Sequence, residues 1–299
     1  MKKRTKILLS LSVIFILLGI AFIIGGFIRG ANPIYIFRDE MFDYKVQEKR
    51  TSDVSKDGKY LISAEGISEI SVEWKNGRII VEPYAGSKIL IKENSLDEFN
   101  EENALTYKKS GDTLKIKFSP FREGNAFSKT SDDGKTLHIY LPKNRNWEKV
   151  KINTVNSNIF VQKMKIAEVE IKEVSGEVFV NKMNLEKLKF NSVGGFLNIA
   201  RTMAADIKIT TTTGDVDAKL RKCPEKLYYD AVSGAAKFYI PVNSEFTVDI
   251  TSLKGSFNSD FEGVYEKDRF IVGTGSAEFK VNETNGSVNI EKSAKKLHK

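Results

Sequence analysis

The chain has 299 residues, an apolar fraction of 41% and a formal net charge of +8 at pH 7. These values are typical of a folded protein with a sizeable core and exclude a disordered chain. Five of the positive charges lie within the first 29 residues, which leaves +3 for the remainder, so the charge does not indicate nucleic-acid binding. Cys223 is the single cysteine, which excludes an intramolecular disulfide and a cysteine-rich zinc site. We expect it to pack in the core.

The N-terminal segment predicts a membrane anchor. Residues 7–28 form a run of 22 residues without a charge, long enough as a helix to cross a hydrocarbon core of about 30 Å. The basic tail 1–6 should remain in the cytoplasm, which places everything after the helix outside. A cleaved signal peptide is the alternative, but its apolar region is normally about 7 to 15 residues and ends in an A-x-A-like site. We therefore expect an uncleaved single-pass anchor in the cell membrane.

Residues 29–59 predict a juxtamembrane linker, with Pro33 near its start and turn-forming residues near its end. From residue 60 to 145 apolar residues alternate with polar ones, which is typical of half-buried strands. Ile70, Val72 and Trp74 form one such set before a turn at Asn76-Gly77. Residues 120–133 are irregular and predict a loop. This region is expected to be the N-terminal β part of a larger β structure.

Residues 146–290 carry a repeat. Its pattern is a short apolar strand, a glycine and a second strand, and the central glycines are spaced 19, 19, 20 and 21 residues apart. They are Gly176, Gly195, Gly214, Gly234 and Gly255. A fixed period of about 20 residues is the signature of a solenoid. The sequence therefore predicts an all-β fold, a β-solenoid or β-helix-like stack of two-strand rungs of 19–21 residues, ending in a basic tail at 291–299.

The repeat also predicts which side chains face inward. In the rung around Gly176, we expect Val174, Gly176, Val178 and Val180 on the inner face. Their neighbours Glu173, Ser175, Glu177 and Phe179 are then expected to face outward. Val193 and Leu253 take the inward position of Val174 in their own rungs, and Ser157 stands where the other rungs have glycine. Glycine suits the corner of a rung because it tolerates positive φ and needs no room for a side chain. A phosphate-binding loop is not indicated, because each glycine precedes a strand and not a helix.

The order of these elements resembles the bacterial DUF4097 family of proposed adhesins with β-strand repeats, which includes LiaG-like proteins of an envelope-stress locus. The matching stretches are Ile67–Trp74 leading into Asn76–Val81, Gly111–Ile116, Leu137–Pro142 and the Ser-Gly-x-Val rungs. The resemblance covers residues 60–290. It implies a β-solenoid exported to the cell envelope, and no activity or site residues that can be transferred.

No catalytic or metal site is indicated. His138 is the only histidine outside the tail, where His298 lies, and it is expected on an outward strand position, so a hydrolytic triad is not supported. Two histidines and one cysteine are too few for zinc. Asp206, Asp215 and Asp217 raise the question of calcium, but the nonapeptide repeat of calcium-binding β-rolls is missing. We predict no metal, no cofactor and no catalytic residue.

The sequence therefore favours a non-catalytic, adhesin-like or envelope-associated binding scaffold, with the membrane and a cell-wall polymer or another envelope protein as partners and no nucleic acid. Two alternatives stay open: a regulatory partner of an envelope-stress sensor, and a carbohydrate-active β-helix enzyme. The enzyme would use an outward carboxylate cluster of the kind that Glu168, Glu170, Glu173 and Glu177 could form with Lys172. The residues predicted for surface recognition are Glu173, Glu177 and Phe179. Oligomeric state is left open.

Overall fold

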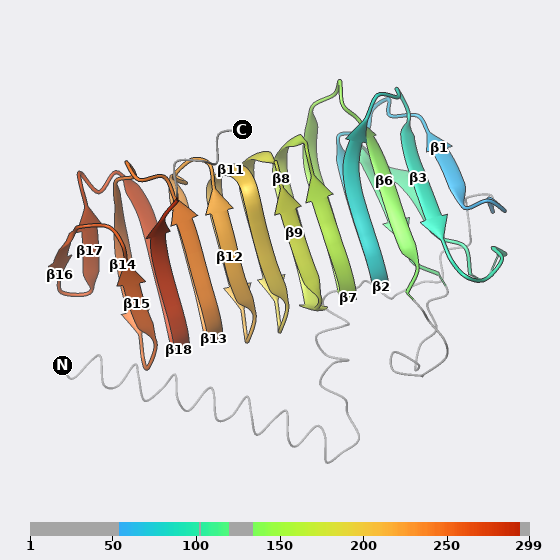
Figure 1. Cartoon of the computed structure of the whole chain (residues 1–299). Helices are drawn as coiled ribbons and strands as arrows, with labels where there is room; N and C mark the ends of the chain where they lie inside the picture. The colour runs from blue at the N-terminus through green and yellow to red at the C-terminus, as the bar shows by residue number, and fades with distance from the viewer. Residues whose placement is uncertain (1–53, 102, 120–133, 294–299) are drawn as a thin grey trace, which may run out of the picture. The chain divides into compact units, whose positions relative to one another are not determined.

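The computed structural model describes residues 54–101, 103–119 and 134–293, which belong to one compact unit, Lys49–Lys299. Within these ranges the secondary structure consists of strands alone (Figure 1), so the prediction of an all-β fold is confirmed. The predicted anchor 7–28, the basic tail 1–6, most of the linker 29–59 and the predicted loop 120–133 lie outside the described residues. In the described part of the chain, no helix has the length and apolar character needed to cross a membrane.

The described strands join in one continuous sheet. In chain order they are β1 (Lys59–Ile62), β2 (Glu69–Tyr84), β3 (Ile89–Asn94), β4 (Thr106–Ser110), β5 (Thr113–Lys117), β6 (Thr136–Pro142), β7 (Trp147–Gln162), β8 (Lys165–Ser175), β9 (Glu177–Asn181), β10 (Asn184–Ser192), β11 (Phe196–Thr211), β12 (Asp215–Leu220), β13 (Lys226–Ile240), β14 (Phe246–Ser252), β15 (Ser256–Ser259), β16 (Val264–Glu266), β17 (Arg269–Val272) and β18 (Ala277–Lys292).

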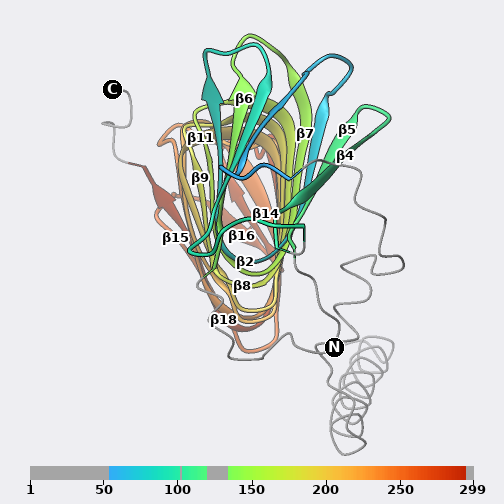
Figure 2. The same cartoon turned by 90° about the vertical axis from the view of Figure 1, so that its right-hand side faces the viewer.

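The repeat produces a parallel stack of rungs between β7 and β13. Val178 of β9 lies between Ile159 of β7 and Leu197 of β11, and Val216 of β12 follows Leu197. Each rung folds two strand segments against each other, so that their inward side chains meet. Figure 2 looks along this stack and shows the rungs nearly superimposed as a flattened coil. Stacked strands lie about 4.8 Å apart.

The order along the stack departs from the order along the chain at both ends. The last strand, β18, pairs in parallel with β13 on one side and with β14 and β15 on the other. Similarly, β2 pairs in parallel with β7 on one side and with both β5 and β6 on the other. Rungs in simple sequence order are therefore found only from β7 to β13. At the C-terminal end, the last strand β18 is inserted between β13 and the earlier strands β14 and β15, which therefore lie farther out in the stack.

Antiparallel strands close the two ends of the stack. At the N-terminal end β3 pairs with β6, β1 with β3, and β4 with β5. At the C-terminal end β17 pairs with β14 and β16 with β17. These outer strands cover the apolar edges of the last parallel rungs, and only three to six residues form each of them. Short outer strands reduce edge-to-edge aggregation.

The core consists of aligned columns of apolar side chains. One column runs through Ile152, Ile171, Phe190, Ile209 and Tyr229, which occupy matching positions of successive rungs and are at most 1% exposed. Such columns bury each apolar side chain between the rungs before and after it. Burial of a single side chain of this size stabilises the fold by about 1.5–3 kcal/mol. A rung is therefore stable only within the stack.

At the corner, the predicted faces need a correction. Glu173 is 1% exposed and points inward, whereas Val193 and Leu253, predicted inward, are 36% and 58% exposed. Val174 is only partly buried. The reason is that the inward alternation of β8, which passes through Ile171, continues to Glu173, and the corner then places two successive residues outside. The predicted alternation resumes after Gly176, because Val178 and Val180 are fully buried.

The corner glycines are explained mainly by space. The φ angle is positive at Gly176 (139°) and Gly234 (132°), which agrees with the expectation that glycine is used at the corner because it tolerates positive φ. A Cβ atom at Gly214 would lie 2.6 Å from Thr211 Oγ1, and one at Gly255 would lie 2.5 Å from the Glu283 carboxylate. At Gly214 the inward side chain three residues earlier fills the place of a Cβ, and at Gly255 a carboxylate from the neighbouring strand β18 does so. Ser157 is accommodated because its hydroxyl forms a 2.6 Å hydrogen bond with Thr154.

Candidate binding face

The two outward faces of the stack have different chemistry. We call the face formed by the first strand of each rung the salt-bridged face, because lysines and acids alternate along it. Lys149 of β7 contacts Glu168 at 2.9 Å and Glu170 at 2.6 Å, both from β8. Lys189 of β10 contacts Glu168 at 3.0 Å, and Lys187 of β10 contacts Asp206 of β11 at 3.3 Å. These pairs join neighbouring rungs and favour their correct register.

Glu168 and Glu170 are poor candidates for acid–base catalysis. Although partial burial acts to raise their pKa values, the hydrogen bonds from Lys149 and the charges of nearby lysines hold both pKa values below the usual range. A glycosidase needs one carboxyl group with a raised pKa to protonate the leaving group. A shallow hollow of about 390 Å³ lies beside Glu168 and is lined by five acids and two lysines. The two lysines, Lys149 and Lys187, pair with Glu168 and Asp206, so Glu168 and Glu170 serve as partners of lysines.

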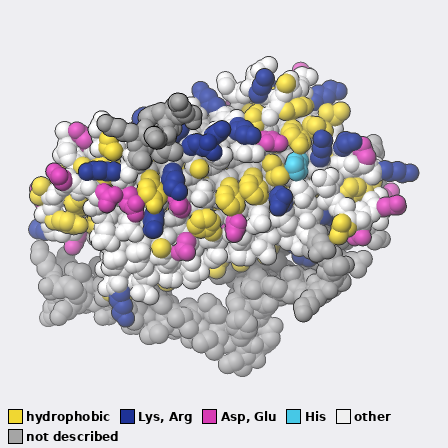
Figure 3. Space-filling model, in the orientation of Figure 1, with side chains coloured by type: hydrophobic (Ala, Val, Ile, Leu, Met, Phe, Trp, Pro, Cys, Tyr) yellow, Lys and Arg dark blue, Asp and Glu magenta, His cyan; other side chains and the backbone are white. Residues whose placement is uncertain are grey.

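The opposite face carries aromatic and apolar side chains. We call it the aromatic face, and it consists of Arg78 and Ile80 of β2, Phe160 of β7, Phe179 of β9 and Phe196 of β11. The rings of Phe160 and Phe179 stack with centroids 4.9 Å apart and planes 6° apart, and the Arg78 guanidinium lies 5.8 Å from the Phe160 centroid. All but Arg78 are partly buried, and Arg78 is exposed. Figure 3 shows yellow side chains across the middle of this face.

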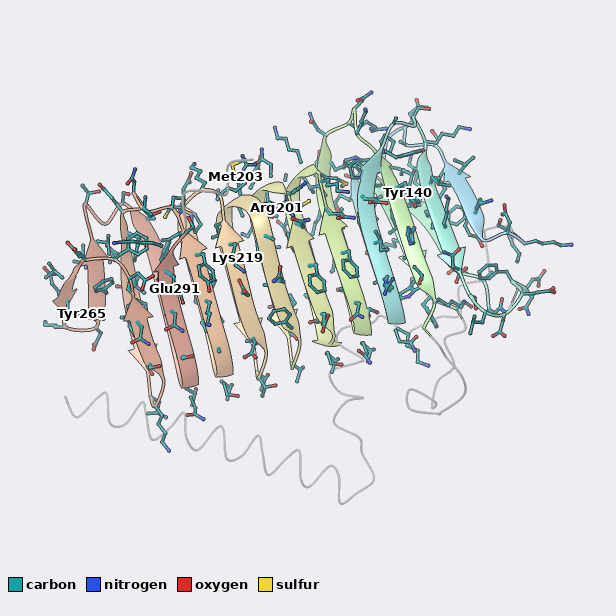
Figure 4. All side chains as sticks on the ribbon, viewed as in Figure 1. Tyr140, Arg201, Met203, Lys219, Tyr265 and Glu291 are labelled. Carbon is teal, nitrogen blue, oxygen red and sulfur yellow. The ribbon has the colours of Figure 1, made fainter. Side chains whose placement is uncertain are left out.

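Polar groups surround the aromatic side chains. Asn158 of β7 lies beside Arg78, and Asn198 of β11 lies beside Phe179. Each amide can both donate and accept hydrogen bonds. At the N-terminal end of the face, His138 of β6 lies beside Ile80 and its Nδ1 is 3.1 Å from the Tyr140 hydroxyl. Burial lowers the pKa of His138, so the ring is neutral at pH 7. Tyr140 is labelled in Figure 4 on this face.

The structure separates the three residues predicted for surface recognition. Glu177 and Phe179 lie on the aromatic face, where Glu177 is exposed and Phe179 is partly exposed. Glu173 is inside the corner and cannot take part in surface recognition. Phe160 and Phe196 were missed, although the 19-residue repeat indicates them: Phe160 precedes Phe179 by 19 residues, and Phe196 follows Glu177 by 19.

Glu173 belongs to a column of inward polar residues at the corner. Its neighbours in adjacent rungs are Thr154 of β7 and Ser192 of β10. The Ser192 hydroxyl donates a 3.3 Å hydrogen bond to Glu173 Oε1, while Glu173 Oε2 is buried without a partner among the described residues. Burial raises the pKa of Glu173 to about 7, against a smaller lowering by the Ser192 hydrogen bond. The group is therefore partly protonated at neutral pH.

Glu283 occupies the same column near the C-terminal end. It is 5% exposed and lies between Ala231 of β13 and Ser252 of β14. Burial raises the pKa of Glu283, as it does that of Glu173. Its carboxylate lies against Gly255 and Gly286. Both buried acids thus fill space beside glycines, which is a structural role.

The aspartates considered for calcium have structural partners. Asp215 Oδ1 accepts a 2.7 Å hydrogen bond from the backbone N–H of Ala235 in the next rung. Asp217 pairs with Lys219 at 3.3 Å. A separate trio, Glu69, Asp112 and Glu148, brings three carboxylates within 4.8 Å of one another, but two of the three are exposed. Exposed acids of this kind are common without a metal ion, so the trio does not define a metal site.

The chain is similar to several solved structures of bacterial proteins. A candidate cell adhesion protein from Clostridium sporogenes is 13% identical, with 81% of this chain and 100% of that chain covered and a TM-score of 0.40. A candidate adhesin from Bacteroides fragilis is 11% identical, with 82% and 99% covered and a TM-score of 0.41. One from Parabacteroides distasonis is 11% identical, with 81% and 98% covered and a TM-score of 0.43.

None of the curated proteins matches the chain significantly. The model of the Toastrack DUF4097 family, in contrast, matches residues 67–201 and 148–291. The two matches overlap and together span nearly all of the described rungs, so the resemblance inferred from the sequence is confirmed. The chain belongs to the Toastrack DUF4097 family.

Proposed function

We propose that the protein is a non-catalytic binding scaffold of the cell envelope. In this proposal a single-pass anchor holds the β-solenoid outside the membrane, and the aromatic face binds an extended envelope polymer. The observation that carries the proposal is the stack of Phe160 on Phe179, flanked by Arg78 and Phe196, on the face opposite the salt-bridged face.

The aromatic face suits a linear ligand. Equivalent positions recur at each rung, about 4.8 Å apart. The aromatic and amide groups therefore lie in two parallel rows across the rungs, with Phe160, Phe179 and Asn198 in one of them, and do not form a closed pocket. Aromatic side chains provide large contact areas with little loss of rotamer entropy. The amides of Asn158 and Asn198 offer both donors and acceptors, which matches the hydroxyl groups of a glycan. A glycan chain lying across the rungs would contact several of these groups at once.

The two faces support binding on one side only. On the salt-bridged face, ion pairs neutralise Lys149, Lys187 and Lys189 within the protein. On the aromatic face, Phe160 and Phe179 stack on each other beside Arg78 and remain partly exposed. Partly exposed apolar side chains that form a continuous patch are typical of binding surfaces.

The binding test compares aromatic truncations on the two faces. The full-length chain, purified in detergent, is mixed with insoluble cell-wall glycan, and the bound fraction is measured. Phe160→Ala with Phe179→Ala should weaken binding at least about tenfold, as expected for two interface aromatics. Tyr228→Ala removes an aromatic ring from the salt-bridged face and should leave binding unchanged. Equal binding by all three proteins would contradict the proposal.

Membrane topology needs its own test. In intact cells, a cysteine introduced at the exposed position Val232, with Cys223 replaced by serine, should react with a membrane-impermeant maleimide. A cysteine at Lys3 should react only after the cells are lysed. Labelling at position 232 that also requires lysis would show that the β unit is inside the cell.

A further inference from the structure

A line of cations runs along the second corner of the stack, where each rung passes to the next. Lys163 follows β7, Lys182 follows β9, Arg201 lies within β11 and Arg221 follows β12. Backbone hydrogen bonds connect these turns: the N–H of Lys163 bonds Asn181 O, that of Lys182 bonds Ala200 O, and that of Arg221 bonds Thr202 O. The four residues therefore occupy successive rungs, and we call them the basic ridge.

Three residues of the ridge have an unusual backbone conformation. The φ angles are 62° at Lys163, 56° at Lys182 and 51° at Arg201, which is the left-handed region. Glycine and asparagine adopt this region at least cost, whereas long side chains rarely do. The sequence nevertheless places a basic residue at this position in three successive rungs. Strain that recurs with one side-chain chemistry indicates that the side chains have a use.

The ridge charges are exposed and are not neutralised nearby. All four side chains are exposed. Within the described ranges, the ion pairs at 4.0 Å or less include none that involves Lys163, Lys182, Arg201 or Arg221; the nearest pair along this corner is Lys222 with Glu225 at 3.8 Å. Lys149, Lys187 and Lys189 of the salt-bridged face, in contrast, are paired between rungs. The ridge therefore presents a concentrated positive field.

The ridge borders the aromatic face. Gln162, Asn181 and Ala200 end the outward side of the rungs on that face, and Lys163, Lys182 and Arg201 follow them directly. Figure 4 shows Arg201 with Met203 at the upper edge of the sheet, above Lys219. In Figure 3 dark blue side chains gather along the same edge, above the yellow side chains. A polymer on the aromatic face could therefore reach both surfaces.

We propose that the basic ridge binds a linear polyanion, so that the envelope polymer of the proposed function carries phosphate or similar anionic groups along its length. This inference rests on the proposed function only in assigning both surfaces to one polymer. Four cations in single file, one per rung at about 4.8 Å, suit an extended chain of regularly spaced anions. The flexible side chains can adjust to a different anion spacing. A lipid surface is less well matched, since it would need cations spread over an area.

The test uses Lys163→Asn, Lys182→Asn and Arg201→Asn together in the full-length chain in detergent, with long-chain inorganic polyphosphate as the probe. Asparagine fits the left-handed conformation, so the variant should fold and its melting temperature should rise by on the order of a few degrees. Its affinity for polyphosphate should fall at least about tenfold. The slope of log Kd against log salt should decrease by about one for each cation removed.

The control removes equal charge from the salt-bridged face, with Lys208→Gln, Lys226→Gln and Lys280→Gln, which are all exposed. It should keep the wild-type affinity and salt slope. If the two triple variants lose affinity equally, the effect is that of net charge and the proposal is wrong. Phe160→Ala with Phe179→Ala should leave the polyphosphate salt slope unchanged, which separates a failure of the ridge from a failure of the aromatic face.

A footprinting experiment separates the polymer from lipid headgroups. Acetylation of Lys163 and Lys182 by an amine reagent is measured by mass spectrometry, with Lys226 as the internal reference. Polyphosphate should protect Lys163 and Lys182 in phosphatidylcholine nanodiscs. If phosphatidylglycerol nanodiscs protect the two lysines and polyphosphate does not, the proposal of a linear polyanion is wrong and the ridge binds a lipid surface.

Discussion

The carboxylate of Glu173 fills the space in which a side chain of Gly195 would begin. Glu173 lies at the corner of one rung and Gly195 at the corner of the next, and a Cβ atom at Gly195 would overlap Glu173 Oε1. Ser192 connects the two, because its hydroxyl accepts a 2.8 Å hydrogen bond from the Gly195 N–H and donates to Glu173. A buried acid and a glycine thus depend on each other across neighbouring rungs.

Gly195→Ala should therefore destabilise the protein, and the cost should depend on residue 173. In the wild-type background the added Cβ forces the Glu173 carboxylate to move, and overpacking of this kind typically costs about 1–3 kcal/mol. In a Glu173→Ser background the same substitution should cost less, since serine is shorter. A double-mutant cycle by urea denaturation measures the coupling, and additive effects of the two changes would rule out the contact.

The stability of the protein should depend on pH through Glu173. Its pKa is about 7 in the folded protein, compared with an ordinary value of 4.5. Between these values the folded state binds more protons than the unfolded state, so the free energy of unfolding falls as pH rises from 4.5 to 7 and stays low above pH 7. The full effect is on the order of 3 kcal/mol.

Glu173→Gln removes this titration while keeping the shape of the side chain. Relative to wild type, the variant should gain stability steadily from pH 4 to pH 8, as measured by urea denaturation at several pH values. Comparison with wild type at each pH cancels the contribution of other groups, including Glu283. A difference between the two proteins that does not change with pH would contradict the assignment.

The inward and outward positions after the corner make a paired prediction. Val178 is fully buried, and Val178→Asp would place a charge in the apolar column, which should cost several kcal/mol. Glu177 is exposed on the neighbouring position, so Glu177→Lys should change stability by less than about 0.5 kcal/mol. Thermal unfolding of both variants measures this, and equal melting temperatures would refute the face assignment.

The buried ion pair at the N-terminal end of the stack predicts a large loss of stability when its lysine is replaced. Lys135 Nζ lies 2.8 Å from Glu93 Oε1, and both side chains are at most 8% exposed. Lys135→Met removes the cation that lies against the buried Glu93 carboxylate and should cost about 3–5 kcal/mol. The partly exposed pair of Lys117 with Glu73, at 3.4 Å, is the control. Lys117→Met should cost less than about 1 kcal/mol, and similar losses in urea denaturation would contradict the distinction.

The position of β18 predicts that the end of the described chain is not an end of the stack. Because β18 pairs with β13 on one side and with β14 and β15 on the other, its backbone amides should exchange with solvent as slowly as those of β13. Amides of β16, which among the described strands pairs with β17 alone, should exchange much faster. Hydrogen exchange followed by mass spectrometry measures both. Rapid exchange throughout β18 would show that the strand frays as a terminal rung.

The repeat was visible in the sequence because its physical cause is local. A glycine recurs about every 20 residues, and apolar residues such as Val178 and Val180 alternate around it, since each rung has the same corner and the same inner wall. This periodicity is enough to predict an all-β stack and the family. It also placed Glu177 and Phe179 on the outer surface. Phe160 and Phe196 could have been found by applying the same 19-residue step to these two residues.

Three features depended on tertiary structure. The first is the inward position of Glu173. At the corner between β8 and β9 two successive residues lie outside, which interrupts the alternation of inward and outward side chains. No local sequence pattern shows where that alternation resumes. The insertion of β2 and β18 between rungs distant in sequence depends on the pairing of whole strands. The basic ridge was not predicted, because Lys163, Lys182 and Arg201 are ordinary surface residues in the sequence and form one line only when the rungs are stacked.

The sequence by itself thus determined the type of fold, since the rung repeat, the apolar alternation and the corner glycine are properties of about 20 consecutive residues. Only the tertiary structure decided the order of the rungs at both ends, the buried state of Glu173 and the surfaces available for binding. The reason is physical: an apolar residue is buried in any stack that the repeat can form, whereas the environment of a charge at a corner depends on which rung lies next to it.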